Sequence, residues 1–169
     1  MNSILKAWNE ADEAEALEAM MACCGARRWA AAMIGLRPLK SVFELSEAAD
    51  REWGTMEEPD WMEAFACHPR IGERKTPQAS AQSVSWSRQE QSQAMAADER
   101  LLDKLAEGNA LYEQRFGFTY IVCATGKSAE EMLAILERRL NNGREAELRE
   151  AAEQQRQIMQ LRLGKWLIA

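Results

Sequence analysis

Residues 118–125 read FTYIVCAT, and this stretch decides the fold class. It is a run of β-branched and aromatic residues that follows Gly117, which is typical of a strand. The rest of the chain shows no second run of this kind. A lone strand has no partner for its backbone hydrogen bonds. The sequence therefore predicts an all-α protein with one short extended segment near 118–125.

Helical periodicity fills most of the remaining chain, because apolar residues recur at i, i+3 and i+4 spacing. Capping signals divide the pattern: Ser41 with Glu44, and Ser128 with Glu131, are spaced as capping boxes, and Gly25 is expected to stop a helix. No linker and no internal repeat interrupts residues 1–169, so we expect one compact multi-helix domain. The expected helices cover residues 3–8, about 10–23, 26–36, a segment after Ser41, a segment from Pro59 to Cys67, 87–117 with a break near 97–99, 128 to about 143, and 144–167.

Residues 72–86, GERKTPQASAQSVSW, form the longest stretch without helical periodicity. They are polar and rich in small residues, which is typical of a loop. A loop of this length in a compact domain is more often a functional segment than a connector. We therefore expect this stretch to border a functional site.

Composition excludes several classes of partner. The 169 residues carry a formal net charge of −6, with a sequence pI of about 5.0. Nucleic acids and anionic membranes both bind basic surfaces, so neither is an expected partner. No apolar run approaches the roughly 20 residues that span a bilayer. The start MNSILKAWNE has no signal-peptide core and the end WLIA is no peroxisomal signal, so we expect a cytoplasmic protein.

The four cysteines are expected to be reduced core residues. Cys23, Cys24, Cys67 and Cys123 show no CxxC spacing, and adjacent cysteines make a poor disulfide framework. A zinc site needs several nitrogen or sulfur ligands in close geometry, and scattered cysteines with one histidine do not offer that. The sequence predicts no metal site.

The single histidine of the chain, His68, lies in ACHPRIGER, residues 66–74. Proline disfavours helical geometry at the preceding residue, so His68 is expected at the C-terminal end of a helix. One interpretation is structural, because the helix dipole favours a protonated histidine there. The other is a proton-transfer group whose backbone is held rigid by Pro69.

The stretch SRQEQ, residues 87–91, also allows two interpretations. Ser87 and Glu90 are spaced as a capping box. With Gln91 they also lie on one helical face, at i, i+3 and i+4, where a hydroxyl, a carboxylate and an amide would meet a small polar ligand.

Arg162 and YIVCA, residues 120–124, are the remaining candidates. Arg162 falls inside the apolar face of the last helix, so its guanidinium either extends to solvent or binds an anion such as a carboxylate. YIVCA is either a buried apolar connector or, if extended and unpaired, a stretch whose backbone groups bind a planar, amide-rich ligand.

Five stretches taken together resemble the 2-oxo-4-hydroxy-4-carboxy-5-ureidoimidazoline (OHCU) decarboxylases, from about residue 20 to 168. They are RRWAAAMIGLRP, WMEAFACHPRIGE, SRQEQ, RFGFTYIVCATGKSAEEMLAILERRLNN and QIMQLRLGKWL. Leu39 after Arg37-Pro38, and SQAM after Gln91, depart from the family pattern. The resemblance implies an all-helical, cofactor-free, usually dimeric enzyme of urate (purine) catabolism. This carboxy-lyase converts OHCU to (S)-allantoin and CO₂.

The resemblance also assigns roles to individual residues. It implies that His68 is the catalytic acid/base, that Glu90 assists it, and that Pro69 shapes the site. The residues that it implies for substrate contact are Pro69, Ser87, Glu90, Gln91, Tyr120, Ile121, Val122, Cys123, Ala124 and Arg162.

Two other functions are compatible with the residues. The nine methionines and six tryptophans would suit a helical interaction module with an exposed apolar groove. A thiol enzyme would use Cys67 or Cys123 with His68, although neighbouring side chains on a helix diverge.

Overall fold

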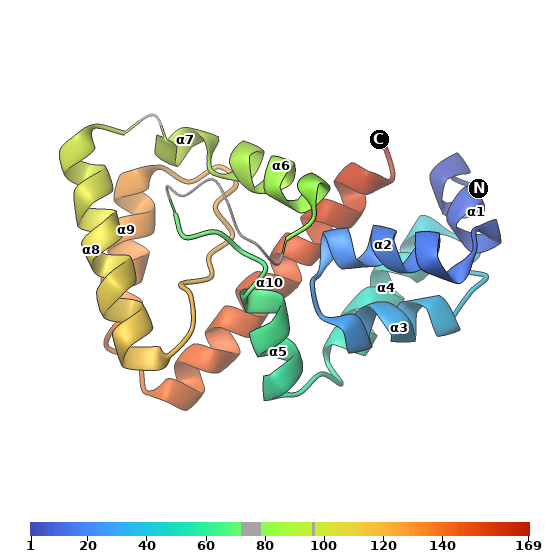
Figure 1. The fold of residues 1–169 in the computed structure, drawn as a ribbon, viewed down its shortest axis with the longest axis horizontal. Coiled ribbons are helices and arrows are strands. Elements are labelled where there is room, and N and C mark those ends of the chain that lie inside the picture. The colour runs from blue at the N-terminus through green and yellow to red at the C-terminus, as the bar shows by residue number, and fades with distance from the viewer. Residues whose placement is uncertain (72–78, 96) are drawn as a thin grey trace. The chain divides into compact units, whose positions relative to one another are not determined.

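The computed structural model describes residues 1–71, 79–95 and 97–169, and within them the regular elements are helices (Figure 1). The all-α prediction is confirmed. The helices are α1 (Ser3–Glu10), α2 (Glu13–Cys23), α3 (Arg27–Gly35), α4 (Val42–Trp53), α5 (Glu58–Phe65), α6 (Ala81–Glu90), α7 (Ser92–Met95), α8 (Glu99–Phe116), α9 (Ala129–Arg139) and α10 (Arg144–Trp166).

The chain forms two compact units. The first unit comprises Met1–Ala64 with Arg156–Ala169, and the second comprises Phe65–Gln155. The expectation of one domain over residues 1–169 stays a prediction.

The core of the first unit is built around α3, which contacts α2 and α4. Trp29 and Met33 of α3 are fully buried. The indole Nε1–H of Trp29 donates to the carbonyl oxygen of Ala49 in α4 over 3.1 Å. The large ring therefore fills the core while its one polar atom is satisfied.

Most methionine and tryptophan side chains fill cores and do not form an exposed groove. The buried ones are Trp8, Met20, Trp29, Met33, Trp53, Met56, Trp86, Met132 and Met159. Their use as packing residues removes the main argument for a helical interaction module.

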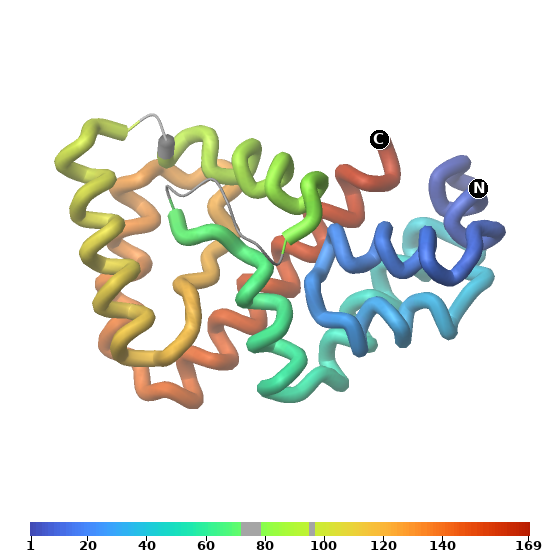
Figure 2. Tube along the Cα trace, in the orientation of Figure 1, coloured from blue at the N-terminus to red at the C-terminus, as the bar shows by residue number. Residues whose placement is uncertain are grey.

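In the second unit α8 and α9 lie side by side (Figure 1). They approach closely at Gly108, where an added Cβ would lie 2.5 Å from Cδ2 of Leu136. Both helices run in the same direction, because the segment between them returns along their length (Figure 2). A connection of that kind needs an extended stretch of chain.

Gly117 begins this return. It ends α8 with a left-handed φ of 82°, a conformation that favours glycine, and its N–H donates to Glu113 O. Residues 118–125 then run without helix or strand, as predicted. The extended segment is confirmed.

The start of α6 differs from the prediction. The helix begins at Ala81, not Ser87, and its cap is Ser80, whose Oγ accepts from the N–H of Ser83 over 3.1 Å. Ser87 is buried within the helix, so the capping-box interpretation of Ser87 and Glu90 is wrong. The stretch 79–86 was expected to be a loop because its polar residues hide the helical period. Residues 72–78 of that predicted loop lie outside the described residues.

Other helix ends show which signals were correct. The caps at Ser41 and Ser128 are confirmed, since their Oγ atoms accept from the N–H groups of Glu44 and Glu131. α9 ends at Arg139, several residues before the expected end near Gly143. α2 ends at Cys23 as predicted, but Gly25 is no left-handed stop, because the described residues with positive φ are Gly117 and Gly126.

All four cysteines are thiols, as expected, and Cys67 is half-buried while the other three are buried. Burial raises the pKa of Cys23 to about 12, although the nearby charge of Arg162 lowers it, so Cys23 stays protonated. None of the helices in the described ranges combines the length and the apolar character that crossing a bilayer requires.

We expect Ser80→Ala to destabilise the protein by about 1 kcal/mol, because the first turn of α6 loses its side-chain cap. This corresponds to a fall of roughly 2–4 °C in the melting temperature, measured by circular dichroism. Ser85→Ala, at an exposed position within the same helix, is the matched control and should leave the melting temperature unchanged. Equal effects of the two substitutions would contradict the cap.

Candidate active site

His68 lies just beyond the end of α5, in a turn that the backbone holds in place. Its N–H donates over 3.1 Å to the carbonyl oxygen of Phe65, the last residue of the helix. The histidine is half-buried and the following Pro69 is buried. The prediction that His68 follows a helix end is confirmed.

The ring of His68 has a specific buried partner. Nε2 lies 2.6 Å from Oε1 of Gln155, a residue of α10 that is 1% exposed. An amide oxygen only accepts hydrogen bonds, so Nε2 is the donor. This hydrogen bond orients the ring more specifically than the helix dipole would. The helix dipole was the basis of the structural interpretation of this histidine.

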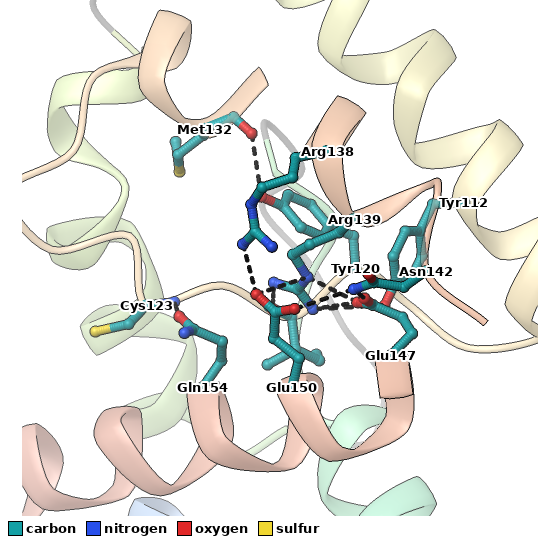
Figure 3. Close-up of polar contacts among 11 residues, drawn as sticks. Tyr112, Tyr120, Cys123, Met132, Arg138, Arg139, Asn142, Glu147, Glu150 and Gln154 are labelled. Atoms are coloured by element: carbon teal, nitrogen blue, oxygen red, sulfur yellow. Dashed lines mark hydrogen bonds and ion pairs between the residues drawn. The ribbon is translucent and has the colours of Figure 1, made fainter. Parts of the chain in front are cut away.

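The segment Tyr120–Ala124 is buried throughout, and α9 and α10 hold it. The hydroxyl of Tyr120 donates to the carbonyl oxygen of Met132 in α9 over 3.1 Å. The N–H of Cys123 donates to Oε1 of Gln154 in α10 over 2.9 Å. Figure 3 shows Gln154 pointing from α10 toward Cys123.

Gln154 and Gln155 are consecutive residues of α10. One accepts from the backbone of Cys123 and the other accepts from the ring of His68. The structure thereby ties the histidine and the extended segment, more than fifty residues apart in sequence, to the same turn of one helix. This is the central geometric feature of the site.

Arg139 is the second anchor of the segment. It is fully buried, and its Nη1 donates to the carbonyl oxygen of Ile121 over 2.6 Å. Its Nε donates to Oε1 of Glu147 over 2.7 Å, and Glu147 is fully buried too. Figure 3 shows the guanidinium between the segment and the carboxylates of Glu147 and Glu150 on α10.

Aromatic rings complete the surroundings of this ion pair. The guanidinium carbon of Arg139 lies 4.9 Å from the ring centre of Tyr120, within the range of a cation–π contact. The hydroxyl of Tyr112 donates to Glu147. Nδ2 of Asn142 donates to the other carboxylate oxygen of Glu147 over 2.9 Å. The buried carboxylate therefore accepts from three side chains.

The charges in this cluster follow from burial and pairing. Burial raises the pKa of Tyr112 far above its ordinary value, and the hydrogen bond to Glu147 raises it further, so the phenol stays a neutral donor. Burial alone would lower the pKa of Arg139, but the hydrogen bond to Glu147 and the adjacent tyrosines raise it above its ordinary value. The guanidinium remains charged.

Protein side chains, not a ligand, satisfy several backbone groups of the segment. The Ile121 carbonyl accepts from Arg139, the Cys123 N–H donates to Gln154, and the Cys123 carbonyl accepts from Nζ of Lys127 over 2.7 Å. The helices α9 and α10 bring side chains to these groups, so they do not depend on a ligand. That the segment Tyr120–Ala124 also binds a ligand stays a prediction.

The three polar residues at the end of α6 are buried, with exposed fractions of 3% for Ser87, 9% for Glu90 and 7% for Gln91. Ser87 and Glu90 belong to the last turns of the helix, and Gln91 is its C-cap residue. Buried hydroxyl, carboxylate and amide groups are costly unless they are hydrogen-bonded. Their burial agrees with the helical-face interpretation and not with a solvated helix start.

Arg162 belongs to the first unit. It is 2% exposed, so the interpretation that its side chain extends to solvent is wrong. Its charge lies close enough to Cys23 to lower the pKa of that thiol. The other predicted site residues all belong to the second unit.

Sequence analysis missed three residues of this site: Arg139, Gln154 and Gln155. The helical period contained a signal for two of them. At about 100° per residue, Gln155 falls on the same apolar face of α10 that singled out Arg162. Arg139 likewise shares a face with Met132 and Leu136 of α9. A polar side chain on a buried face needs a partner, and no such pattern marks Gln154, which is half-buried.

A metal site does not emerge from the ranges that the structure describes, since no group of three or more potential ligands gathers there.

Fold and site together define an all-helical protein in which one histidine is held against a buried amide of α10, and the same turn of that helix fixes a stretch of backbone. The family model described as OHCU decarboxylase matches residues 9–164. The chain belongs to the OHCU decarboxylase family.

Relatives from plants, archaea and mammals agree with this assignment. The uric acid degradation bifunctional protein TTL of Arabidopsis thaliana is 38% identical over 144 residues, which are 85% of this chain and 44% of that protein. The OHCU decarboxylase of Haloferax volcanii is 27% identical over 136 residues, 76% of this chain and 74% of the relative. The mouse OHCU decarboxylase is 36% identical over 101 residues, 57% of this chain and 54% of the relative. The chain thus spans about half the length of the plant and mouse relatives.

Two solved structures share the fold. A crystal structure of an OHCU decarboxylase in the presence of (S)-allantoin is 34% identical, with a TM-score of 0.77 over 90% of this chain and 99% of that chain. A crystal structure of (S)-allantoin synthase has a TM-score of 0.71 over 96% of this chain and 53% of that chain. At 17% identity the second likeness concerns the fold alone.

We expect Arg139→Met to lower the free energy of unfolding by about 3–5 kcal/mol, because it leaves the carboxylate of Glu147 buried without its cation. Urea denaturation measures this change. Arg138→Met is the matched control: its side chain is 60% exposed in its ion pair with Glu150, so it should cost no more than about 1 kcal/mol. Similar losses for both variants would contradict the importance of the buried pair.

We expect the stability contributed by Glu150 to disappear in acid. Burial raises the pKa of Glu150, but hydrogen bonding to Arg138 and the nearby charge of Arg139 outweigh it, and the pKa lies below its ordinary value of 4.5. A carboxyl group whose pKa is lower in the folded state stabilises the protein at pH values above its pKa in the unfolded state. This stabilisation is lost as the pH falls through the pKa of the folded state.

The check for this effect is the difference in unfolding free energy between wild type and Glu150→Gln across pH. The difference should be up to about 1 kcal/mol near pH 7 and should vanish well below pH 4.5. The exposed Glu137→Gln variant is the control and should follow the wild type throughout. A difference that persists at low pH would contradict the assignment.

Proposed function

We propose that this chain decarboxylates OHCU to (S)-allantoin. Membership of the OHCU decarboxylase family supports the substrate and the reaction. The observation that carries the proposal is the joint anchoring of His68 and the Tyr120–Ala124 segment on consecutive glutamines of α10. It fixes one titratable ring and one stretch of backbone on the same turn of a helix, and a decarboxylation with a stereospecific proton transfer requires groups that are held in place.

The substrate supplies its own electron acceptor. When the bond between the ring carbon and the carboxylate breaks, CO₂ leaves and the electron pair forms a double bond to the adjacent ring carbon. The π pair of the neighbouring C=N moves to nitrogen, which takes up a proton. The hydroxyl group then loses its proton as a carbonyl forms, while the ureido-bearing carbon gains one, so atoms and charge balance.

In this proposal His68 and Glu90 manage the hydroxyl proton and the proton added to carbon. Delivery of that proton from one face of a held substrate yields a single enantiomer. General acid–base help of this kind contributes about 10²–10⁴-fold, and placement of the substrate contributes up to about 7–11 kcal/mol in favourable cases.

The binding residues in this proposal are Pro69, Ser87, Gln91 and the backbone of Tyr120–Ala124. Alternate residues of an extended chain present their backbone groups to opposite sides. Because the groups of Ile121 and Cys123 meet Arg139, Gln154 and Lys127, those of Val122 point the other way. We assign the Val122 backbone to the ureido or ring amides of the substrate.

Three expectations extend the proposal on the resemblance and composition alone. Arg162 anchors a substrate oxygen, the protein acts as a homodimer without a cofactor, and its compartment is the cytoplasm.

The test generates OHCU in situ from urate with the upstream enzymes, then follows its decay and the optical activity of the allantoin. We expect the wild type to accelerate the decay and to yield the S enantiomer. Chelator treatment should not change the rate. If the protein neither accelerates decay nor produces one enantiomer, the proposal fails.

We expect His68→Asn to lower kcat by about 10²–10⁴-fold, because asparagine cannot take up and return a proton. Ala66→Ser, at an exposed position two residues earlier, is the control and should keep the wild-type rate. A full rate for His68→Asn would remove histidine from the mechanism and leave the substrate assignment intact.

A further inference from the structure

Gln155 is a polar residue in a place where an apolar one would suit the fold better. It is 1% exposed and shares the buried side of α10 with Ala151 and Ala152. Its Oε1 lies 2.6 Å from Nε2 of His68, but its own Nε2 is buried without a hydrogen-bond partner in the described part of the chain.

The unsatisfied amide nitrogen makes Gln155 costly for stability. A buried donor without an acceptor loses its hydration and gains nothing in return. A leucine would fill a similar volume without that loss, and His68, which is half-buried, could still be hydrated. Residues that break a packing rule in this way are typically retained for function.

We propose that Gln155 is a positioning residue that fixes the orientation and the neutral tautomer of His68. Because Oε1 can only accept, the ring proton is held on Nε2 and the lone pair of the neutral ring lies on Nδ1. The function of this lone pair rests on the proposed decarboxylase activity: Nδ1 is the nitrogen that takes a proton from the substrate and returns it.

The contact serves both protonation states of the ring. In the imidazolium the Nε2–H···O bond remains and becomes charge-assisted, so it strengthens when Nδ1 takes up a proton. The ring does not have to rotate or exchange partners between the two steps. Gln155 thereby keeps the basic nitrogen pointing in one direction through the reaction.

The single histidine of the chain makes the tautomer directly measurable. In the untagged protein labelled with ¹⁵N-histidine, the long-range ¹H–¹⁵N spectrum contains the ring of His68 alone. We expect a protonated Nε2 and an unprotonated Nδ1 at a pH where titration shows a neutral ring. A proton on Nδ1 would overturn the proposal, because it would make Gln155 a donor.

Gln155→Leu removes the acceptor, and we expect it to give a mixture of tautomers without lowering the melting temperature. Its kcat should fall at least about tenfold, within the total contribution of acid–base catalysis, while KM changes little. Unchanged tautomer and kcat in this variant would overturn the proposal.

Two further variants separate positioning from packing. Gln154→Leu, at the adjacent residue, breaks the bond to Cys123 and is expected to raise KM while the proton of His68 stays on Nε2. Gln155→Glu keeps an acceptor oxygen and should restore the proton on Nε2 even if Gln155→Leu does not fold. A loss of the Nε2 proton in Gln154→Leu, or its absence in Gln155→Glu, would contradict the role of Gln155.

The spectra also distinguish this inference from the proposed function. A wild type with the proton on Nε2 and no decarboxylase activity would refute the function while the positioning of His68 by Gln155 stands. An active wild type with the proton on Nδ1 would refute the positioning alone.

Discussion

A buried stretch of backbone that is not helical must find its hydrogen-bond partners among side chains, and this constraint shapes the second unit. The segment Tyr120–Ala124 is buried, and backbone groups of Ile121 and Cys123 meet side chains in place of water. Arg139 and Gln154 reach it from α9 and α10. The buried ion pair of Arg139 with Glu147 exists because a cation brought in to hold a carbonyl needs its own counter-charge.

The same helix that completes this network also holds the histidine. Gln154 accepts from the segment and Gln155 accepts from the ring of His68, so a displacement of α10 would move both. Rigid elements with supporting hydrogen bonds are what keep catalytic groups in place. The second unit therefore fixes one titratable ring, His68, and one stretch of backbone, Tyr120–Ala124, to the same turn of α10.

The site also shows a conflict between stability and function. A fully buried guanidinium and carboxylate gain little over apolar side chains of similar size. The amide nitrogen of Gln155, which has no hydrogen-bond partner among the described residues, is a net cost. Apolar packing around Trp29, Met33 and Leu136 supplies the stability that these polar groups do not. These polar groups are explained by their role in orienting the Tyr120–Ala124 segment and the ring of His68.

The sequence by itself determined the fold class, the place of the extended segment and several helix ends. These features depend on local chemistry: the period of apolar residues, the hydroxyl of Ser41 or Ser128, and the conformational freedom of Gly117 act within a few residues of themselves. His68 and the position of Arg162 on an apolar face could be predicted for the same reason, since both are visible in one dimension. The sequence left open whether the Arg162 side chain extends to solvent, and only the structure showed that it is buried. The start of α6 was missed because Ser80 and Ser87 have the same capping chemistry, and only packing decides which of them begins the helix.

Only the tertiary structure decided the partners. The contacts of His68 with Gln155, Cys123 with Gln154 and Ile121 with Arg139 join residues 18 to 87 positions apart. No local preference encodes such a pairing, because the amide or guanidinium could bond equally well to water or to any nearby carbonyl. The packing of α8, α9 and α10 brings each of these groups to the partner that it has in the structure.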